Sequence, residues 1–205
     1  MELQYMINKS RYFQRQYFRN MRKKLNIEDR KEFSDRASDI AFNCNELLSS
    51  KNVAIFMSFD GEIDTSPLIL KLWRKNYNVF LPIIHSYLEK ILIFVPYFPD
   101  TIVKFNKFNI IEPEIDKKKD VLFSKKDMDV IIVPLVAFNK NGYRLGMGGG
   151  FYDRILKNWK KEEFVPIGLA YSFQLSNEII PSYWEVPLLK IVTPDKLWSW
   201  NINRA

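Results

Sequence analysis

The segment "DVIIVPLVAF", residues 129–138, decides the fold that we predict, together with the glycine-rich segment "RLGMGGGFYDR", residues 144–154. Residues 130–138 form the longest apolar run of the chain, and such a run between polar segments is typical of a buried strand. After the glycines, "FYDRILKNWKK", residues 151–161, has the apolar spacing of a helix. The order strand, glycine loop and helix is typical of an α/β sheet.

The rest of the chain alternates in the same way. Apolar spacing predicts helices over residues 10–25, 28–48 and 65–76, and apolar runs predict strands over 53–58, 78–84, 91–98, 165–171 and 189–195. We therefore expect a single Rossmann-like domain over residues 1–205, a three-layer α/β/α fold with a mostly parallel sheet and helices on both faces. We expect residues 1–9 to be a flexible N-terminal extension, 196–205 a C-terminal tail, and the charged stretch 99–127 irregular, with 115–120 at the surface.

The composition excludes several classes of protein. Apolar residues make up 47% of the chain and aromatic residues 15%, which is enough for a real core and excludes disorder. No apolar run approaches the roughly 20 residues of a membrane-spanning helix. The single cysteine, Cys44, lies on the apolar stripe of its predicted helix, so we expect a core residue in a protein of the reducing cytoplasm. The single histidine, His85, excludes a histidine metal cluster and a Ser-His-Asp triad, and we expect it to be structural or exposed.

The net charge of +7 favours anionic partners. Basic residues concentrate between Lys9 and Lys24, without an acidic residue among them. Such a run is compatible with a solvated helix face. Because aromatic residues interleave with these cations, an arm that binds nucleic acid is the alternative, although no known reader motif accompanies it.

The glycine loop is suited to an anion. Five of the chain's 7 glycines lie at positions 142, 146, 148, 149 and 150. Glycines let backbone N–H groups approach a phosphate, and the N-terminus of the following helix adds positive potential. Arg144 offers a fork to a phosphate, and Asp153 is placed to cap the helix or to hold Mg²⁺. The P-loop and dinucleotide fingerprints do not fit, and a tight turn for close packing is the structural alternative.

A resemblance to a known family makes the prediction specific. "VPLVAFNKNGYRLGMGGGFYDRIL", residues 133–156, resembles the signature of the 5-formyltetrahydrofolate cyclo-ligase family. The resemblance continues in "MSFDGEIDTSPLI" (57–69), "IIEPE" (110–114), "IGLAYSFQL" (167–175) and "VPLLKIVTPD" (186–195), and spans about residues 11–195. It implies a single α/β/α domain, in agreement with the alternation found above.

The resemblance also implies an activity: conversion of 5-formyltetrahydrofolate into 5,10-methenyltetrahydrofolate with MgATP, releasing ADP and phosphate. ATP phosphorylates the formyl oxygen, and N10 of the folate then attacks the activated carbon; no protein nucleophile is required. We expect a monomer, with a weak dimer as the alternative, and no membrane or nucleic-acid partner. Polyglutamylated folates are expected substrates, because the chain is basic.

The resemblance assigns roles to residues of this chain. Arg144 and Asp153 are expected to be catalytic, and Asp153 and Glu185 to hold Mg²⁺. The expected nucleotide-binding residues are Arg11, Arg15, Arg144, Leu145, Gly146, Met147, Gly148, Gly149, Gly150, Phe151, Tyr152 and Asp153. The expected folate-binding residues are Met57, Glu62, Met147, Gly148, Gly149, Gly150 and Phe151.

The chain departs from the family pattern at four positions. Asn139 stands in place of an Asp, where either residue suits a turn. Phe151 stands in place of a Tyr and keeps the ring. Glu185 replaces a metal-binding Asp and keeps the carboxylate on a longer arm, whereas Leu189 replaces another Asp without a rationale. A relative with the same ATP site and another substrate is the remaining enzymatic alternative.

Overall fold

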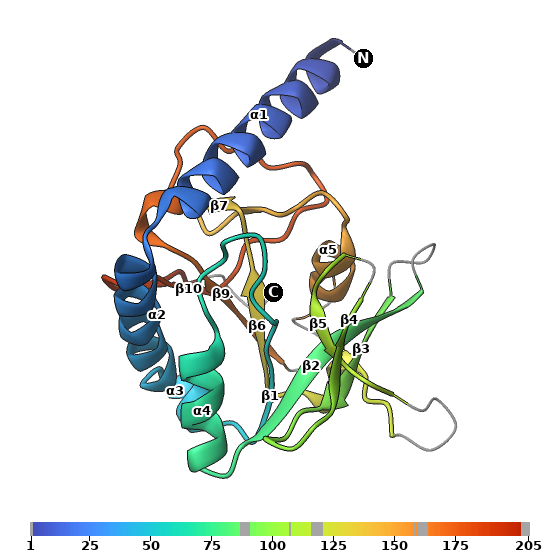
Figure 1. Ribbon diagram of the computed structural model, residues 1–205. Coiled ribbons are helices and arrows are strands. Elements are labelled where there is room, and N and C mark those ends of the chain that lie inside the picture. Colours follow the sequence, from blue (N-terminus) through green and yellow to red (C-terminus); the bar gives the residue numbers. More distant parts are fainter. Residues whose placement is uncertain are drawn as a thin grey trace.

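The protein is described from a computed structural model, which covers residues 2–86, 91–106, 108–115, 121–157, 159 and 164–201, with the backbone alone for 2–9 and 86. A seven-stranded sheet forms its centre (Figure 1). The strand order is β11 (Leu197–Ser199), β10 (Lys190–Val192), β9 (Val165–Leu169), β6 (Val130–Pro134), β1 (Asn52–Ala54), β2 (Asn78–Ser86) and β3 (Ile91–Pro96). The five inner strands run parallel, and the edge strands β11 and β3 are antiparallel to their neighbours.

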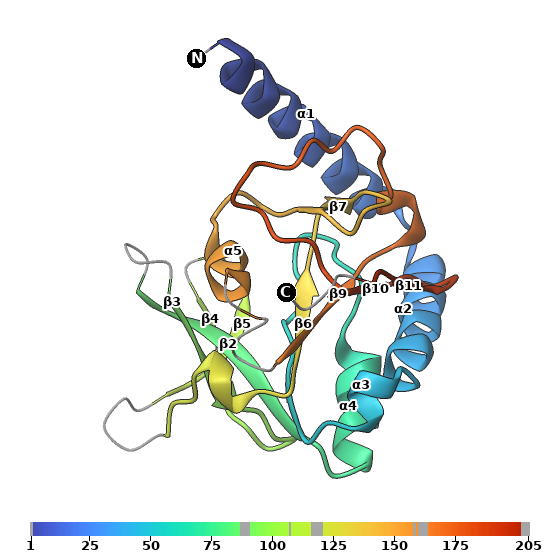
Figure 2. The ribbon, with the colours of Figure 1, turned by 180° about the vertical axis from the view of Figure 1, so that it is seen from behind.

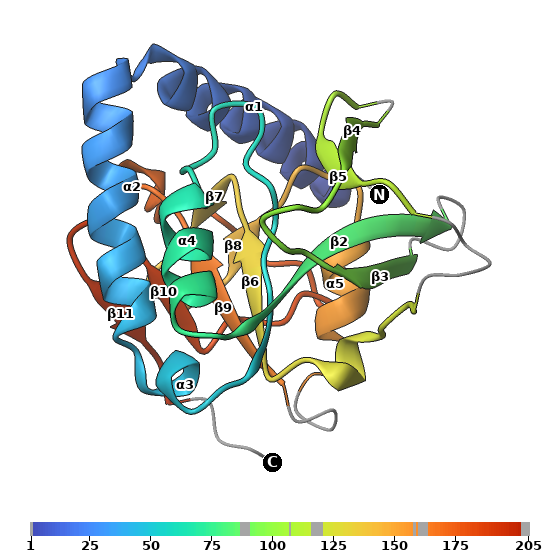
Figure 3. The same cartoon turned by 60° about the horizontal axis from the view of Figure 1, so that its bottom comes forward.

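Helices cover both faces of this sheet. Helices α2 (Ile27–Phe42), α3 (Asn45–Leu48) and α4 (Ser66–Arg74) lie on one face, and α5 (Phe151–Leu156) lies on the other (Figures 2 and 3). The strand residues alternate between two core clusters, as the period of two requires. Val130 and Ile132 pack with α2–α4, whereas Ile131 and Val133 pack with α5. The predicted α/β fold, with a mostly parallel sheet between helices, is confirmed.

The long helix α1 (Glu2–Lys24) lies over one end of the sheet, and its N-terminal half extends beyond the rest of the domain (Figure 1). Phe18 and Met21 of α1 pack against the hairpin of β7 (Ala137–Phe138) and β8 (Arg144–Leu145). A second two-stranded sheet joins β4 (Val103–Phe105) to β5 (Ile111–Pro113) beside β2 and β3. Two short 3₁₀ turns lie at Lys125–Asp127 and Ser172–Gln174.

Several predicted boundaries were wrong. The helix predicted over 28–48 is broken at Asn43 and Cys44. Cys44 is the N-cap residue that precedes α3, and its side chain is buried in the core as expected. The strand predicted over 129–138 stops at Pro134, which has no N–H to donate. The chain then turns away from the sheet into β7.

Three segments that were not predicted to be helix or strand contain regular structure. The predicted tail 196–205 contains β11, and the stretch 99–127 contains β4 and β5. In the predicted extension 1–9, the backbone belongs to α1, which begins at Glu2. His85 is exposed, as expected. Residues 116–120 of the predicted surface segment, and 158 and 160–161 of the predicted helix, lie outside the described residues. Among the helices that are described, none has both the length and the apolar character needed to cross a membrane.

Candidate active site

A cavity of about 390 Å³ opens where the chain leaves the carboxyl ends of β1 and β6. Phe56 and Met57 follow β1, and Leu135 follows β6; all three line the cavity. From β1 the chain continues to β2 on one side, and β6 lies on the other side. The cavity therefore lies at the point where the strand order reverses, which is the usual place for a ligand in an open α/β sheet.

The glycine loop forms one wall of the cavity, from Gly146 to Gly150. Asn139 shapes the turn that precedes it: its Oδ1 accepts hydrogen bonds from the N–H groups of Asn141 (3.0 Å) and Tyr143 (3.1 Å). Gly148 has φ of +99°, a backbone conformation that favours glycine. The helix that follows, α5, comprises 6 residues, so the loop and its neighbouring side chains define this wall.

Three arginines converge on the glycine loop, and each is held by a partner. The guanidinium of Arg144 donates to Asp153 Oδ1 at 2.5 Å. The Nε of Arg15 donates to the carbonyl of Gly146 at 2.8 Å. Arg11 forms a bidentate ion pair with Glu185. All of these side chains line the cavity.

Burial makes this positive charge costly in the absence of an anion. Burial lowers the pKa of Arg144 against the opposing charges of Asp153 and Glu185. It also lowers the pKa of Arg15, and the neighbouring Arg11 adds to that effect. Guanidinium groups stay protonated at physiological pH. The cluster therefore concentrates cationic side chains at one end of the cavity.

The two expected metal ligands, Glu185 and Asp153, each pair with a different arginine. Both carboxylate oxygens of Glu185 are engaged by Arg11, and Oε2 also accepts from the N–H of Ser182 at 2.9 Å. Asp153 uses Oδ1 for Arg144, and its side chain is 37% exposed. Across the described residues, no group of three or more His, Cys, Asp or Glu side chains is arranged for a metal ion. The donor set fits an ion held by Asp153 and ligand oxygens, and Glu185 could join it only by leaving Arg11. The expected pair of metal ligands stays a prediction.

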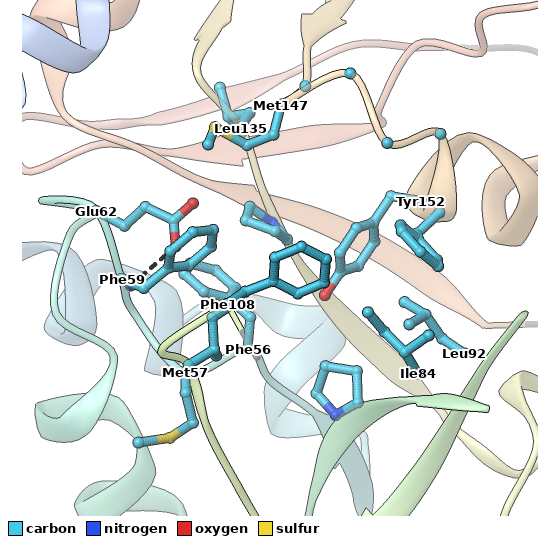
Figure 4. A pocket seen from close by; sticks show the side chains of 18 of the residues that line it. Phe56, Met57, Phe59, Glu62, Ile84, Leu92, Phe108, Leu135, Met147 and Tyr152 are labelled. Carbon is cyan, nitrogen blue, oxygen red and sulfur yellow. Dashed lines mark hydrogen bonds between the residues drawn. The ribbon is translucent and has the colours of Figure 1, made fainter. Parts of the chain in front are cut away.

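The other half of the cavity is mostly apolar, and its lining includes the carboxylates of Glu62 and Glu112. Figure 4 shows Glu62 and Tyr152 on opposite sides of this region in that view, with Phe56, Phe59 and Phe108 between them. Glu62 is 5% exposed, and its Oε2 accepts a hydrogen bond from the N–H of Phe59 at 3.3 Å. Burial raises the pKa of Glu62 to about 7, against the opposing charge of Arg22. Burial also raises the pKa of Tyr152.

The cavity brings together nearly all of the residues that the sequence singled out. It is lined by Arg11, Arg15, Met57, Glu62, Arg144, Gly146, Met147, Gly148, Gly149, Gly150, Phe151, Tyr152, Asp153 and Glu185. Leu145 does not line it, because its side chain is buried among Phe18, Val136 and Ile179.

The sequence did not identify the aromatic and aliphatic residues at the apolar end. Phe108 lies in the stretch that was expected to be irregular, and Ile84 and Leu92 lie in predicted strands. Nothing in the local pattern distinguishes a strand residue that lines a cavity from one in the core. Only the pairing of β2 with β3 brings Ile84 opposite Leu92.

The basic run on α1 is not a uniformly solvated face. Arg11 and Arg22 are buried, at 8% and 0% exposure, and both are paired with carboxylates. Lys23 and Lys24 remain exposed. The helix therefore directs some of its cations into the domain rather than presenting all of them to solvent.

The fold and the cavity define an α/β protein in which one cavity joins three arginines and a glycine loop to a mostly apolar chamber. Residues 7–194 match the sequence profile of the 5-formyltetrahydrofolate cyclo-ligase family. The chain is 40% identical over 182 residues to the 5-formyltetrahydrofolate cyclo-ligase of Escherichia coli (strain K12), across 89% of this chain and 99% of that protein. It is 41% identical over 174 residues to the 5-formyltetrahydrofolate cyclo-ligase of Haemophilus influenzae, across 85% and 92% of the two chains.

A solved structure agrees with these sequence matches. The NMR structure of Aquifex aeolicus 5,10-methenyltetrahydrofolate synthetase has a TM-score of 0.79 and 28% identity, across 95% of both chains. The chain belongs to the 5-formyltetrahydrofolate cyclo-ligase family, so the predicted family and the expectation of a ligase are confirmed.

Proposed function

We propose that this chain converts 5-formyltetrahydrofolate into 5,10-methenyltetrahydrofolate at the expense of ATP, with release of ADP and phosphate. The observation that carries the proposal is one cavity that joins three arginines and a glycine loop to an apolar chamber containing Glu62. Such a cavity has room to hold the phosphates of a nucleotide and the ring of a folate next to each other. The family supports the folate conversion.

The polar end is suited to the triphosphate. Arg144, Arg15 and Arg11 surround the glycine loop, whose backbone N–H groups can approach phosphate oxygens without a Cβ in the way. Arginines hold phosphate by parallel hydrogen bonds and neutralise the charge that is shared by the transferring group. We assign Arg144 and Asp153 as catalytic residues on this basis.

The apolar end is suited to the folate. The reduced pterin ring presents N–H donors at its edge, and the buried Glu62 carboxylate can accept them. Aromatic side chains on either side provide surfaces for the ring. We place the formyl group between Glu62 and the glycine loop, near Met57 and the Met147 to Phe151 segment.

The reaction then depends on the positioning of the two substrates and requires no protein nucleophile. The formyl oxygen attacks the γ-phosphorus of ATP, and ADP leaves. N10 attacks the activated formyl carbon and loses its proton, and the oxygen departs with phosphate as the ring closes. This phosphoryl transfer depends on alignment and charge neutralisation, which the arginines and the loop supply.

Mg²⁺ is proposed at Asp153. A bound Mg²⁺ keeps several waters and bridges nucleotide phosphates, so one protein carboxylate is sufficient. Asp153 is partly exposed and lines the cavity at the phosphate end. Glu185 can contribute only if Arg11 leaves it for the phosphates. Bound there, the ion would neutralise charge on the transferring phosphate.

The setting of the reaction is proposed from the cysteine content and the charge of the chain. A buried, unpaired Cys44 suits a reducing cytoplasm. The basic chain suits polyglutamylated folates, whose tails carry negative charge. We propose a cytoplasmic monomer that acts on these folates.

The direct test is an assay of the purified chain for methenyltetrahydrofolate, which absorbs in the near ultraviolet. Product is expected only when ATP, Mg²⁺ and 5-formyltetrahydrofolate are all present. Omission of each component in turn provides the controls. Absence of ATP-dependent product from folded protein would contradict the proposal.

A further inference from the structure

Arg22 is a completely buried arginine that lies behind the cavity wall rather than in it. It comes from α1, and its side chain is 0% exposed. Its guanidinium contacts Asp60 Oδ2 at 3.1 Å and Glu62 Oε1 at 3.8 Å, and also donates to the carbonyl of Leu135 at 3.5 Å. A buried charge of this kind is tolerated only when it is paired, so these partners must be held in place.

The turn that carries the two carboxylates fits closely against Arg22. Asp60 and Gly61 both have positive φ, at 50° and 73°. A Cβ at Gly61 would come within 3.2 Å of Arg22 Cβ and 3.3 Å of its carbonyl carbon, so only glycine fits there easily. The N–H of Glu62 closes the turn by donating to the carbonyl of Phe59 at 2.9 Å. The backbone conformation of this turn therefore sets Glu62 beside the guanidinium.

Asp60 competes with Glu62 for the same cation. Arg19, Arg22 and Lys23 all contact Asp60, at 2.5, 3.1 and 3.0 Å. Burial alone would raise the pKa of Asp60, but the hydrogen bonds from Arg19 and Lys23 outweigh it and lower the pKa to about 2. Asp60 is thus an anion throughout the physiological range. Its negative charge therefore offsets part of the stabilisation that Arg22 gives to the Glu62 anion.

We propose that Arg22 is a positioning residue for substrate recognition: it holds the Glu62 carboxylate at the cavity wall as an anion that accepts N–H donors of the folate. Asp60 acts in the opposite sense, as the anion that limits this hold. The inference rests on the proposed function for the identity of the ligand. Arg22 itself touches neither substrate nor nucleotide; its effect passes through Glu62.

The charge of Glu62 is set by the opposing effects of Arg22 and Asp60. From α1 it faces Arg22, and from its own turn it faces Asp60. From α5 and from the segment after β9 it faces the phenols of Tyr152 and Tyr171, whose pKa values burial raises. Both phenols are neutral near pH 7. Because burial raises the pKa of Glu62 to about 7, a small change in this balance alters its charge.

Two neutralising variants have opposite predicted effects, which separates this role from a merely structural one. Arg22→Gln removes the attraction, so the Glu62 pKa rises; each unit of rise weakens 5-formyltetrahydrofolate binding by up to about tenfold near pH 7. Asp60→Asn removes the anion that competes for Arg22, so the Glu62 pKa falls. Binding of 5-formyltetrahydrofolate at pH 6 then tightens by up to about tenfold. Asn tolerates the positive φ at this position. Arg22→Lys keeps the charge and serves as the matched control.

The experiment has two measurements. The first is a pH titration of the Glu62 carboxyl carbon by NMR in ¹³C-glutamate-labelled protein without ligand, with the signal assigned by its loss in Glu62→Gln. The second is the dissociation constant of 5-formyltetrahydrofolate from pH 5.5 to 8.5 by calorimetry, with that of an ATP analogue as the reference. We expect the midpoints of both curves to shift upward in Arg22→Gln and downward in Asp60→Asn, with ATP affinity unchanged.

Unmoved midpoints in Asp60→Asn and in folded Arg22→Gln would overturn the inference, as would an equal loss of folate and ATP affinity. If Arg22→Gln does not fold, Asp60→Asn and Arg22→Lys still test it, because their predicted shifts differ. If the wild-type protein binds no 5-formyltetrahydrofolate at any pH, the proposed function fails. The carboxyl titration, which uses no ligand, would then decide separately whether Arg22 controls Glu62.

Discussion

Replacing Arg144 with methionine should weaken ATP binding far more than it weakens the fold. Arg144 is 4% exposed and lines the cavity, and its Nη2 donates to Asp153 Oδ1 at 2.5 Å. A charge-assisted hydrogen bond to phosphate contributes about 1.5–3 kcal/mol. Loss of one such bond corresponds to about 10- to 150-fold in affinity. Asp153 loses its arginine but is 37% exposed, so water can solvate it and the stability cost should be at most about 1 kcal/mol.

The assay is calorimetric titration with a non-hydrolysable ATP analogue in the presence of Mg²⁺, together with a thermal melt. The matched control is Arg154→Met, because Arg154 is exposed on α5, next to Asp153, and does not line the cavity. The control should bind the analogue like the wild type. Wild-type affinity in a folded Arg144→Met variant would refute the assignment of Arg144 to the phosphates.

Three further predictions address the metal, the pH dependence of stability and the loop. Asp153→Asn should lose the Mg²⁺ dependence of nucleotide binding and Glu185→Gln should keep it; a titration with Mg²⁺ that gave the opposite order would exchange their roles. Because burial raises the Glu62 pKa to about 7, the folded state binds the proton more tightly, and the contribution of this group to stability falls as pH rises from about 4.5 to 7. Glu62→Gln should therefore melt at a higher temperature than wild type at pH 8 and lose that advantage near pH 5; an advantage that did not change with pH would contradict the reasoning. Gly148→Ala should cost about 1–3 kcal/mol in chemical denaturation because φ is +99°, whereas Gly146→Ala, with no atom within 4 Å of the added Cβ, should cost less; equal costs would contradict the role of the backbone conformation.

The sheet and its glycine loop could be predicted because their signals are local. The apolar run of residues 130–134 marks a strand buried on both faces, and the glycines follow it directly. The end of the strand was missed, because apolar residues continue past Pro134 into a separate hairpin with β8. An apolar run indicates burial, but it does not indicate which sheet a strand joins.

The arginines of α1 show what could not be predicted from the local sequence. Arg11 and Arg15 were assigned only through the family resemblance, since a run of cations does not say which of them face inward. Arg22 was indistinguishable from its neighbours in the same run. Its burial depends on the close packing of α1 against Gly61, a contact between residues 39 positions apart in the chain. The partner of Glu185 was missed for the same reason: its pair with Arg11 joins the two ends of the sequence.

We propose that ATP phosphorylates the formyl oxygen of the folate in this cavity. The most direct measurement uses 5-formyltetrahydrofolate labelled with ¹⁸O in the formyl group and follows the label by mass spectrometry of the released phosphate. We expect each phosphate formed with methenyltetrahydrofolate to carry one ¹⁸O atom, because the formyl oxygen leaves on phosphorus. Unlabelled phosphate, formed together with the product, would show that ATP does not phosphorylate the formyl oxygen.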